Sequence, residues 1–271
     1  MKKIIVLFLT MTSILTFCQD IKFSEKEIKN KLDSIKTEGN LLYSFEKASW
    51  NSNDIARKNV EIKDLIGAYL TYQNEEFVRT VFLNKSGSEI IAEYNFKNKA
   101  EIPTKINLEV RSLSKIEIDL KNVRQNLISY FSNPANEVGA PKGFSLNIIT
   151  IPFGANFKTY LIPGTSQSNV IPFGNDYLFI TDNNGKILNK KKFHSAMIPV
   201  FGSDDEGNFS ASSTHSHLKE NPFLSATDIC TFRLYAPFTK LTKFSVFSPG
   251  LKKTFEYNMI ENTLEIVKNP F

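Results

Sequence analysis

The feature that most constrains this chain is a short segment near its C-terminal end that gathers metal-binding side chains. Two of only three histidines, His215 and His217, lie one residue apart, and Asp228 follows shortly after them. Alternate residues of a strand point to one side, so both imidazoles share a face, and a carboxylate in the first turn of a following helix can fold back onto them. We therefore expect His215, His217 and Asp228 to bind a divalent ion such as Zn²⁺, with a fourth position open for water.

A simpler interpretation explains part of this segment without a metal. Ser225 and Asp228 have the spacing of a capping box, in which both side chains bond to free N–H groups at a helix start. The two roles are compatible, because a cap can hold the carboxylate in the rotamer that a ligand needs. The third histidine, His194, is expected to be a half-buried strand residue, because a fourth protein ligand would close the position that catalysis needs.

The motif resembles the signature of the JAMM (MPN-plus or JAB) metallohydrolases. His215-Ser-His217 is followed by seven residues and then by Ser225-x-x-Asp228. The resemblance implies zinc bound by His215, His217 and Asp228, with Ser225 stabilising the oxyanion during hydrolysis of a peptide or isopeptide bond. It also implies a JAMM-like, cytidine-deaminase-like mixed sheet with flanking helices in the C-terminal part of the chain.

The chain departs from that signature at the general base. The resemblance implies an upstream glutamate, but no glutamate occurs between Glu137 and Glu206. Asp176, which opens the apolar run 177–180, is the best substitute, provided that its shorter side chain comes within hydrogen-bond reach directly or through one water. Two hypotheses follow. The chain is an exported zinc-dependent hydrolase that uses Asp176, or it is a catalytically impaired JAMM-like pseudoenzyme that acts as a binding or structural envelope protein.

The first residues of the chain have the character of an export signal. Lys2 and Lys3 precede an apolar stretch that is too short for a stable membrane helix. Cys18 would suit a lipoprotein, but the bulky Phe17 precedes it, so ordinary cleavage near Gln19 is favoured. The sequence therefore predicts a secreted or periplasmic protein with no stable membrane span after cleavage.

Charge and cysteine content restrict the partners. The formal net charge of the whole chain is +5, and removing two lysines with the signal leaves +3 (5 − 2), too mild an excess to indicate nucleic-acid binding. The expected partner is a peptide or protein substrate. Cys230 is the one cysteine after the signal, so no internal disulfide is expected, and it is interpreted as a buried apolar residue.

Periodicity predicts a mixed α+β fold in two parts after a signal peptide at residues 1–19. The N-terminal part, 20–140, contains helices and a hairpin, and the JAMM-like part, 141–271, contains the metal site. Helices are expected at 23–40, ended by Gly39, at 41–58 and at 115–131. Turns at 84–87 and 182–185 predict hairpins. A strand ending at His217, a helix from Ser225, a strand at 243–247 and a hairpin at 254–267 complete the prediction.

Overall fold

The computed structural model describes residues 23–74, 76–97, 101–203 and 212–268. The predicted signal peptide, residues 1–19, lies outside these ranges. In the described part of the chain, no helix combines the length and the apolar character that crossing a membrane would require.

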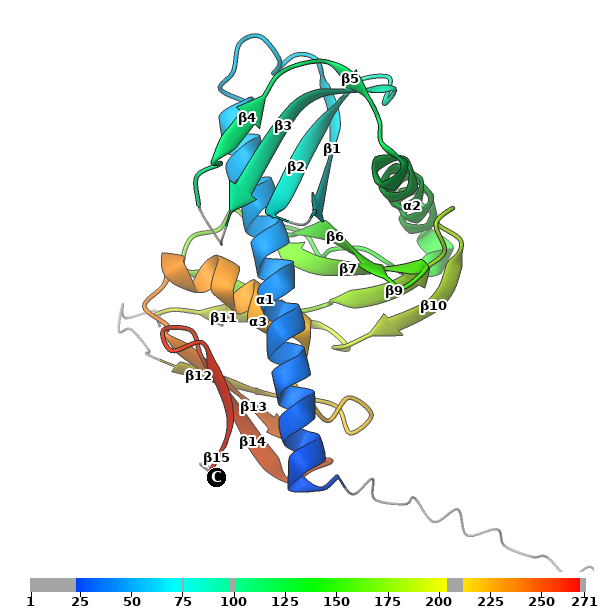
Figure 1. Ribbon diagram of the computed structural model, residues 1–271. Helices are drawn as coiled ribbons and strands as arrows, with labels where there is room; N and C mark the ends of the chain where they lie inside the picture. The colour runs from blue at the N-terminus through cyan, green and yellow to red at the C-terminus, as the bar shows by residue number, and fades with distance from the viewer. Residues whose placement is uncertain (1–22, 75, 98–100, 204–211, 269–271) are drawn as a thin grey trace, which may run out of the picture.

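One long helix, α1 (Glu25–Ala56), runs along most of the molecule (Figure 1). It begins as predicted, because the Ser24 hydroxyl accepts a hydrogen bond from the Glu27 N–H while the Glu27 carboxylate accepts one from the Ser24 N–H. The predicted stop at Gly39 was wrong. Gly39 is buried inside the helix, and the buried face continues through Leu42 and Phe45, so the two predicted helices are one.

Gly39 serves the packing of α1 against a second helix, α3 (Ala226–Tyr235). A Cβ atom added at Gly39 would lie 2.7 Å from Ile229 Cβ and 2.9 Å from the carbonyl oxygen of Ala226. Both distances are shorter than carbon and oxygen atoms can approach without a shift of the backbone. The missing side chain is therefore what allows the two helices to cross this closely.

An antiparallel sheet packs beside the C-terminal half of α1. Its strands are β1 (Ile66–Gln73), β2 (Phe77–Asn84), β3 (Glu89–Lys97), β4 (Lys105–Asn107) and β5 (Arg111–Ser112). The turn between β2 and β3 confirms the predicted hairpin, with Gly87 at φ +69°. Helix α2 (Lys115–Phe131) follows with the predicted bounds, and a short 3₁₀ helix η1 (Pro134–Asn136) comes after it.

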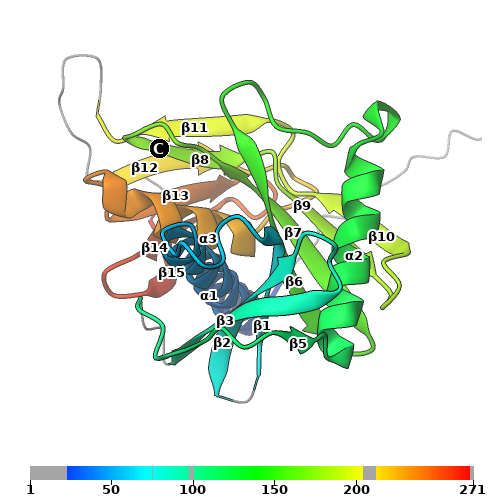
Figure 2. The ribbon, with the colours of Figure 1, turned by 90° about the horizontal axis from the view of Figure 1, so that it is seen from above.

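A second antiparallel sheet has the order β10-β9-β7-β6. Its strands are β6 (Ser145–Phe153), β7 (Asn156–Gly164), β9 (Tyr177–Thr181) and β10 (Ile187–Lys192). Strands β8 (Val170–Gly174) and β11 (Met197–Phe201) form a separate antiparallel pair. The hairpin predicted at 182–185 joins β9 to β10, and Figure 2 shows α2 and α3 on different sides of β6 and β7.

A third sheet of order β12-β13-β14-β15 carries the metal-binding segment. Its strands are β12 (Ser212–Ser216), β13 (Lys243–Ser248), β14 (Lys253–Asn258) and β15 (Thr263–Val267). Strands β12 and β13 are parallel, and they are joined through α3 and the short 3₁₀ helix η2 (Ala236–Phe238). The predicted strand, helix, strand and hairpin of this region are therefore present.

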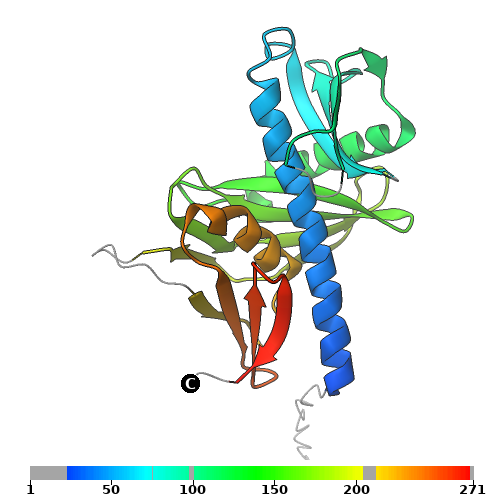
Figure 3. The same ribbon diagram turned by 60° about the vertical axis from the view of Figure 1, so that its left-hand side comes forward.

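The described chain is a mixed α+β fold with several antiparallel sheets and three α-helices, which confirms the broad class. Figure 3 shows β13–β15 beside the N-terminal half of α1 and the first sheet beside its C-terminal half. Ile28, Leu32 and Phe45 of α1 belong to the same buried cluster as residues of α3 and β13–β15. The division into 20–140 and 141–271 stays a prediction, and α1 contributes core residues to both sides of it.

We expect Gly39→Ala to lower the free energy of unfolding by about 1–2 kcal/mol. Overpacking a tight contact costs about 1–3 kcal/mol, which exceeds the gain of about 0.5–1 kcal/mol from replacing a helical glycine. Urea unfolding measures the change. Gly139→Ala is the control, since a Cβ there meets nothing within 4 Å. An unchanged or raised stability in Gly39→Ala would contradict the helix-crossing argument.

Candidate metal centre

Strand β12 and its continuation place the two spaced histidines. His215 lies in β12, and the His217 N–H donates to the carbonyl of Phe247 at 3.0 Å, which continues the pairing with β13 past the strand end. The alternation of side chains along this extended segment turns both imidazoles to one side. Their ring centroids are 5.4 Å apart, as the His-x-His spacing predicts.

The first turn of α3 supplies the carboxylate. The capping box is present, since the Ser225 hydroxyl accepts from the Asp228 N–H at 3.1 Å and the Ser225 N–H donates to Asp228 Oδ2 at 2.8 Å. The same carboxylate faces the histidines. Asp228 Oδ2 lies 3.2 Å from His217 Nε2, and Asp228 Oδ1 lies 3.9 Å from His215 Nε2. The cap therefore holds the carboxylate where the histidines converge.

His194 joins this group, and the expectation that it would be a half-buried strand residue was wrong. It lies in the turn between β10 and β11 and is 4% exposed. Its Nε2 atom lies 2.8 Å from His217 Nε2 and 3.5 Å from Asp228 Oδ1. All three histidines of the chain thus meet at one point. Their scarcity was the available signal, but no local pattern linked His194 to the other two.

The four side chains form a buried group that is able to hold a metal ion. One donor atom from each of His194, His215, His217 and Asp228 lies within 4.8 Å of all the others. In a tetrahedral zinc site with bonds of about 2.0–2.1 Å, neighbouring ligand atoms lie about 3.3 Å apart. The separations of 2.8, 3.2 and 3.5 Å given above lie on both sides of this value. Both ring nitrogens of His215 are buried without a hydrogen-bond partner among the described residues. A bound cation would satisfy one of them.

The structure places the two proposed catalytic side chains next to this group. Asp176 is 2% exposed, and its Oδ1 lies 2.7 Å from His194 Nδ1, while Oδ2 accepts from the Thr227 hydroxyl. Asp176 therefore reaches the group through His194, in the manner of a carboxylate that orients a ligating histidine. The Ser225 hydroxyl bonds to the backbone of α3 and to Thr227 Oγ1 at 2.6 Å, so its geometry is that of a helix cap.

Burial and charge act against each other at these groups. Burial disfavours the charged imidazole of His194, but the carboxylates of Asp228 and Asp176 outweigh it and raise its pKa to about 9. For His215 burial dominates and lowers the pKa to about 4. Burial would raise the pKa of Asp228, yet the nearby histidines hold it well below its usual range. Without a metal, His215 is therefore neutral, as a ligand must be, and metal binding would displace a proton from His194.

Apolar rings pack against His215. The ring centroids of Phe173 and His215 are 5.0 Å apart. The ring of Phe244 is stacked on that of His215, with centroids 6.1 Å apart and an interplanar angle of 5°. Both phenylalanines are almost fully buried. A shell of this kind lowers the local dielectric and strengthens the attraction between an ion and its ligands.

Comparisons with protein-family models, curated proteins and solved structures gave no match to this chain. The resemblance to JAMM metallohydrolases therefore depends on the motif residues alone and stays a prediction.

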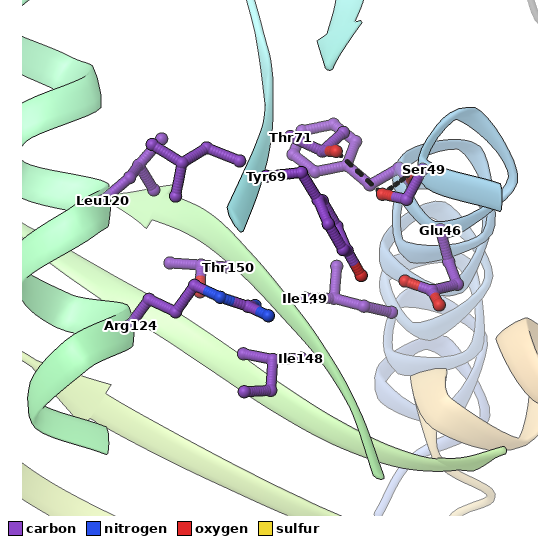
Figure 4. A pocket seen from close by; sticks show the side chains of 11 residues that line it. Glu46, Ser49, Tyr69, Thr71, Leu120, Arg124, Ile148, Ile149 and Thr150 are labelled. Carbon is purple, nitrogen blue, oxygen red and sulfur yellow. Dashed lines mark hydrogen bonds between the residues drawn. The ribbon is translucent and has the colours of Figure 1, made fainter. Parts of the chain in front are cut away.

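A second polar group lies in a small cavity between α1, α2, β1 and β6, about 20 Å³ in volume (Figure 4). Glu46 is 2% exposed there, and the Trp50 indole N–H donates to its carboxylate at 2.8 Å. Arg124 and Tyr69 project toward the same space from α2 and β1. Burial raises the pKa of Glu46 to about 7 although the Trp50 hydrogen bond and the charge of Arg124 oppose the rise. The space suits about one water, which indicates a structural role.

We expect Glu46 to make stability fall as pH rises from about 4.5 to about 7. In this range the folded protein retains a proton that the unfolded chain has lost, because the folded pKa is raised, and the full effect is at most about 3 kcal/mol. Glu46→Gln keeps an acceptor for Trp50 and cannot titrate. The difference in unfolding free energy between wild type and Glu46→Gln should therefore change with pH. The control is Glu25→Gln, at an exposed position of α1, whose unfolding free energy should have the same pH dependence as that of the wild type. Parallel pH curves for wild type and Glu46→Gln would contradict the shifted pKa.

Proposed function

We propose that this protein binds one Zn²⁺ ion through His194, His215, His217 and Asp228. The ion would link three segments through its ligands: the turn after β10, the end of β12 and the first turn of α3. One observation carries the proposal: every histidine of the chain converges on one buried carboxylate, and both nitrogens of His215 lack a partner among the described residues. A buried unpaired polar group costs about 1–3 kcal/mol, so a missing partner is the simplest account of this ring.

The donor set favours zinc over other divalent ions. Three imidazole nitrogens with one carboxylate oxygen suit Zn²⁺, whereas Ca²⁺ and Mg²⁺ prefer six or more oxygen ligands. Cu²⁺ and Ni²⁺ prefer square-planar or tetragonal arrangements, whereas Zn²⁺ is usually tetrahedral with four ligands.

Four protein ligands favour a structural site over a catalytic one. Structural zinc sites are closed by protein, while catalytic sites keep one position for water. Asp176, bonded to His194 Nδ1, would then orient a ligand. The order β12, α3, β13 supports the JAMM-like resemblance, so the chain would be an exported JAMM-like pseudoenzyme that retains the metal for stability and acts as a binding or envelope protein.

We expect purified protein to retain about one zinc ion per chain after dialysis, since it offers a single His₃Asp set. His217→Ala and Asp228→Ala should lose the ion because each removes a ligand. Asp176→Asn should weaken zinc affinity about 10–100-fold, the usual effect of removing a partner of a ligating histidine. Plasma mass spectrometry measures the metal content, and competition with a chelator measures the affinity.

Asp33→Ala is the matched control, because Asp33 is an exposed acid on α1 outside the metal group. Added zinc should raise the melting temperature of the wild type and of Asp33→Ala and leave that of His217→Ala unchanged, since only a folded protein with its site intact gains from the ion. Equal zinc content in wild type and His217→Ala would exclude the site.

A second candidate, a zinc-dependent hydrolase of peptide or isopeptide bonds, is favoured by the Asp176–His194 pair. If His215, His217 and Asp228 alone held the ion, His194 Nε2 would lie beside the open position. The charge of the ion would then have to lower the pKa of His194 before its imidazole could accept a proton from the attacking water. Asp176 would then hold the imidazole of His194, as the carboxylate does in an Asp–His pair. In this candidate the base is His194, and Ser225 would stabilise the oxyanion.

His194→Ala separates the two candidates. A structural site predicts weaker zinc binding in this variant and no zinc-dependent cleavage of a peptide library by the wild type. A hydrolase predicts that the variant retains zinc and loses a cleavage that the wild type performs. Cleavage that is unaffected by His194→Ala would contradict the role of His194 as base.

A further inference from the structure

A separate cavity of about 500 Å³ lies between α1, β10 and the segment that leads into α3. Its wall contains aromatic side chains from distant parts of the chain. Tyr160 and Phe193 are stacked with ring centroids 6.4 Å apart, and Phe23 meets Phe223 edge to face at 5.2 Å. This volume lies within the range of about 300–1,000 Å³ that is typical of small-molecule sites, which are likewise largely apolar.

Three lysines, Lys31, Lys158 and Lys191, face this apolar space, and we call it the lysine-lined cavity. One of them is neutralised. Lys158 Nζ lies 2.6 Å from Glu38 Oε1, which also accepts from the Tyr160 hydroxyl at 2.7 Å. Glu38 therefore already accepts hydrogen bonds from two donors, and its charge does not neutralise Lys31 or Lys191.

Lys31 and Lys191 have no ion-pair partner among the described residues. Lys191 Nζ lies over the ring of Phe193 at 5.1 Å, which directs its charge along the aromatic wall. Burial lowers the pKa of Lys191, and the charge of Lys31 lowers it further. Glu220 is the remaining acid of the lining and is exposed.

We propose that the lysine-lined cavity binds a small organic carboxylate with an aromatic or apolar body. The carboxylate would lie between Lys31 and Lys191, which line the cavity and have no ion-pair partner among the described residues, and the apolar body would pack against Tyr160 and Phe193. Hydrophobic enclosure with a few convergent polar groups is how such ligands are held and oriented. The proposal is independent of the metal centre, since none of the four metal-binding residues lines this cavity.

Naphthaleneacetate and naphthaleneacetamide test the proposal, because the two probes share one shape and differ in charge. Calorimetric titration of the full protein should show saturable binding of one naphthaleneacetate per chain. The amide should bind at least about tenfold more weakly, a difference of about 1.4 kcal/mol. The double variant Lys31→Ala/Lys191→Ala should bind both probes with the same weak affinity, because the remaining contacts are apolar.

The double variant Lys26→Ala/Lys190→Ala is the matched control. It removes one lysine from α1 and one from β10, as the test variant does, and neither residue lines the cavity. It should keep the preference for the acid. Equal affinity of wild type for acid and amide, no binding of the acid, or an equal loss of preference in both double variants would overturn the proposal. Circular dichroism of each variant shows whether it is folded.

Discussion

The structure around the candidate metal centre depends on placing one carboxylate among three imidazoles inside an apolar shell. Asp228 is 1% exposed, and a charge buried this deeply is tolerated only when it is paired and hydrogen-bonded. The helix cap satisfies one side of the carboxylate, and the histidines face the other. A single residue therefore caps the helix and faces the three histidines, so the capping and metal interpretations of the same motif are compatible in geometry.

The carboxylate reaches the histidines only if α3 has the correct position and rotation relative to β12. The close crossing of α3 with α1 restricts both. Gly39 brings the α1 backbone against Ala226 and Ile229, which flank Asp228 in the first turn of α3. On the other side, the parallel pairing of β12 with β13 fixes which face of β12 turns toward α3. A shift of one residue in this pairing would send His215 to the opposite face. The geometry of the site thus follows from packing on two sides of α3.

Elements specified by neighbouring residues could be predicted from the sequence. The helix at Lys115–Phe131 has a continuous apolar stripe, and the Asp182–Gly185 turn has its own favoured backbone geometry. His-x-His and the following capping box likewise lie within one segment. Gly39 and His194 gave no such local signal, because their roles depend on contacts with residues far away in the sequence. Gly39 looked like a helix end until α3 was in place, and His194 looked like an ordinary strand residue until the turn after β10 brought it to Asp228.

The metal centre and the lysine-lined cavity have neighbouring residues in common even though they share no ligand. Phe193, in the wall of the cavity, precedes His194, and Ser225, also in that wall, caps the helix turn that holds Asp228. An occupant of either site would therefore restrain the same two backbone segments, the turn after β10 and the entrance to α3. If one occupant orders these segments, the other binds to a chain that has already lost that conformational freedom, and the coupling free energy must be equal in both directions.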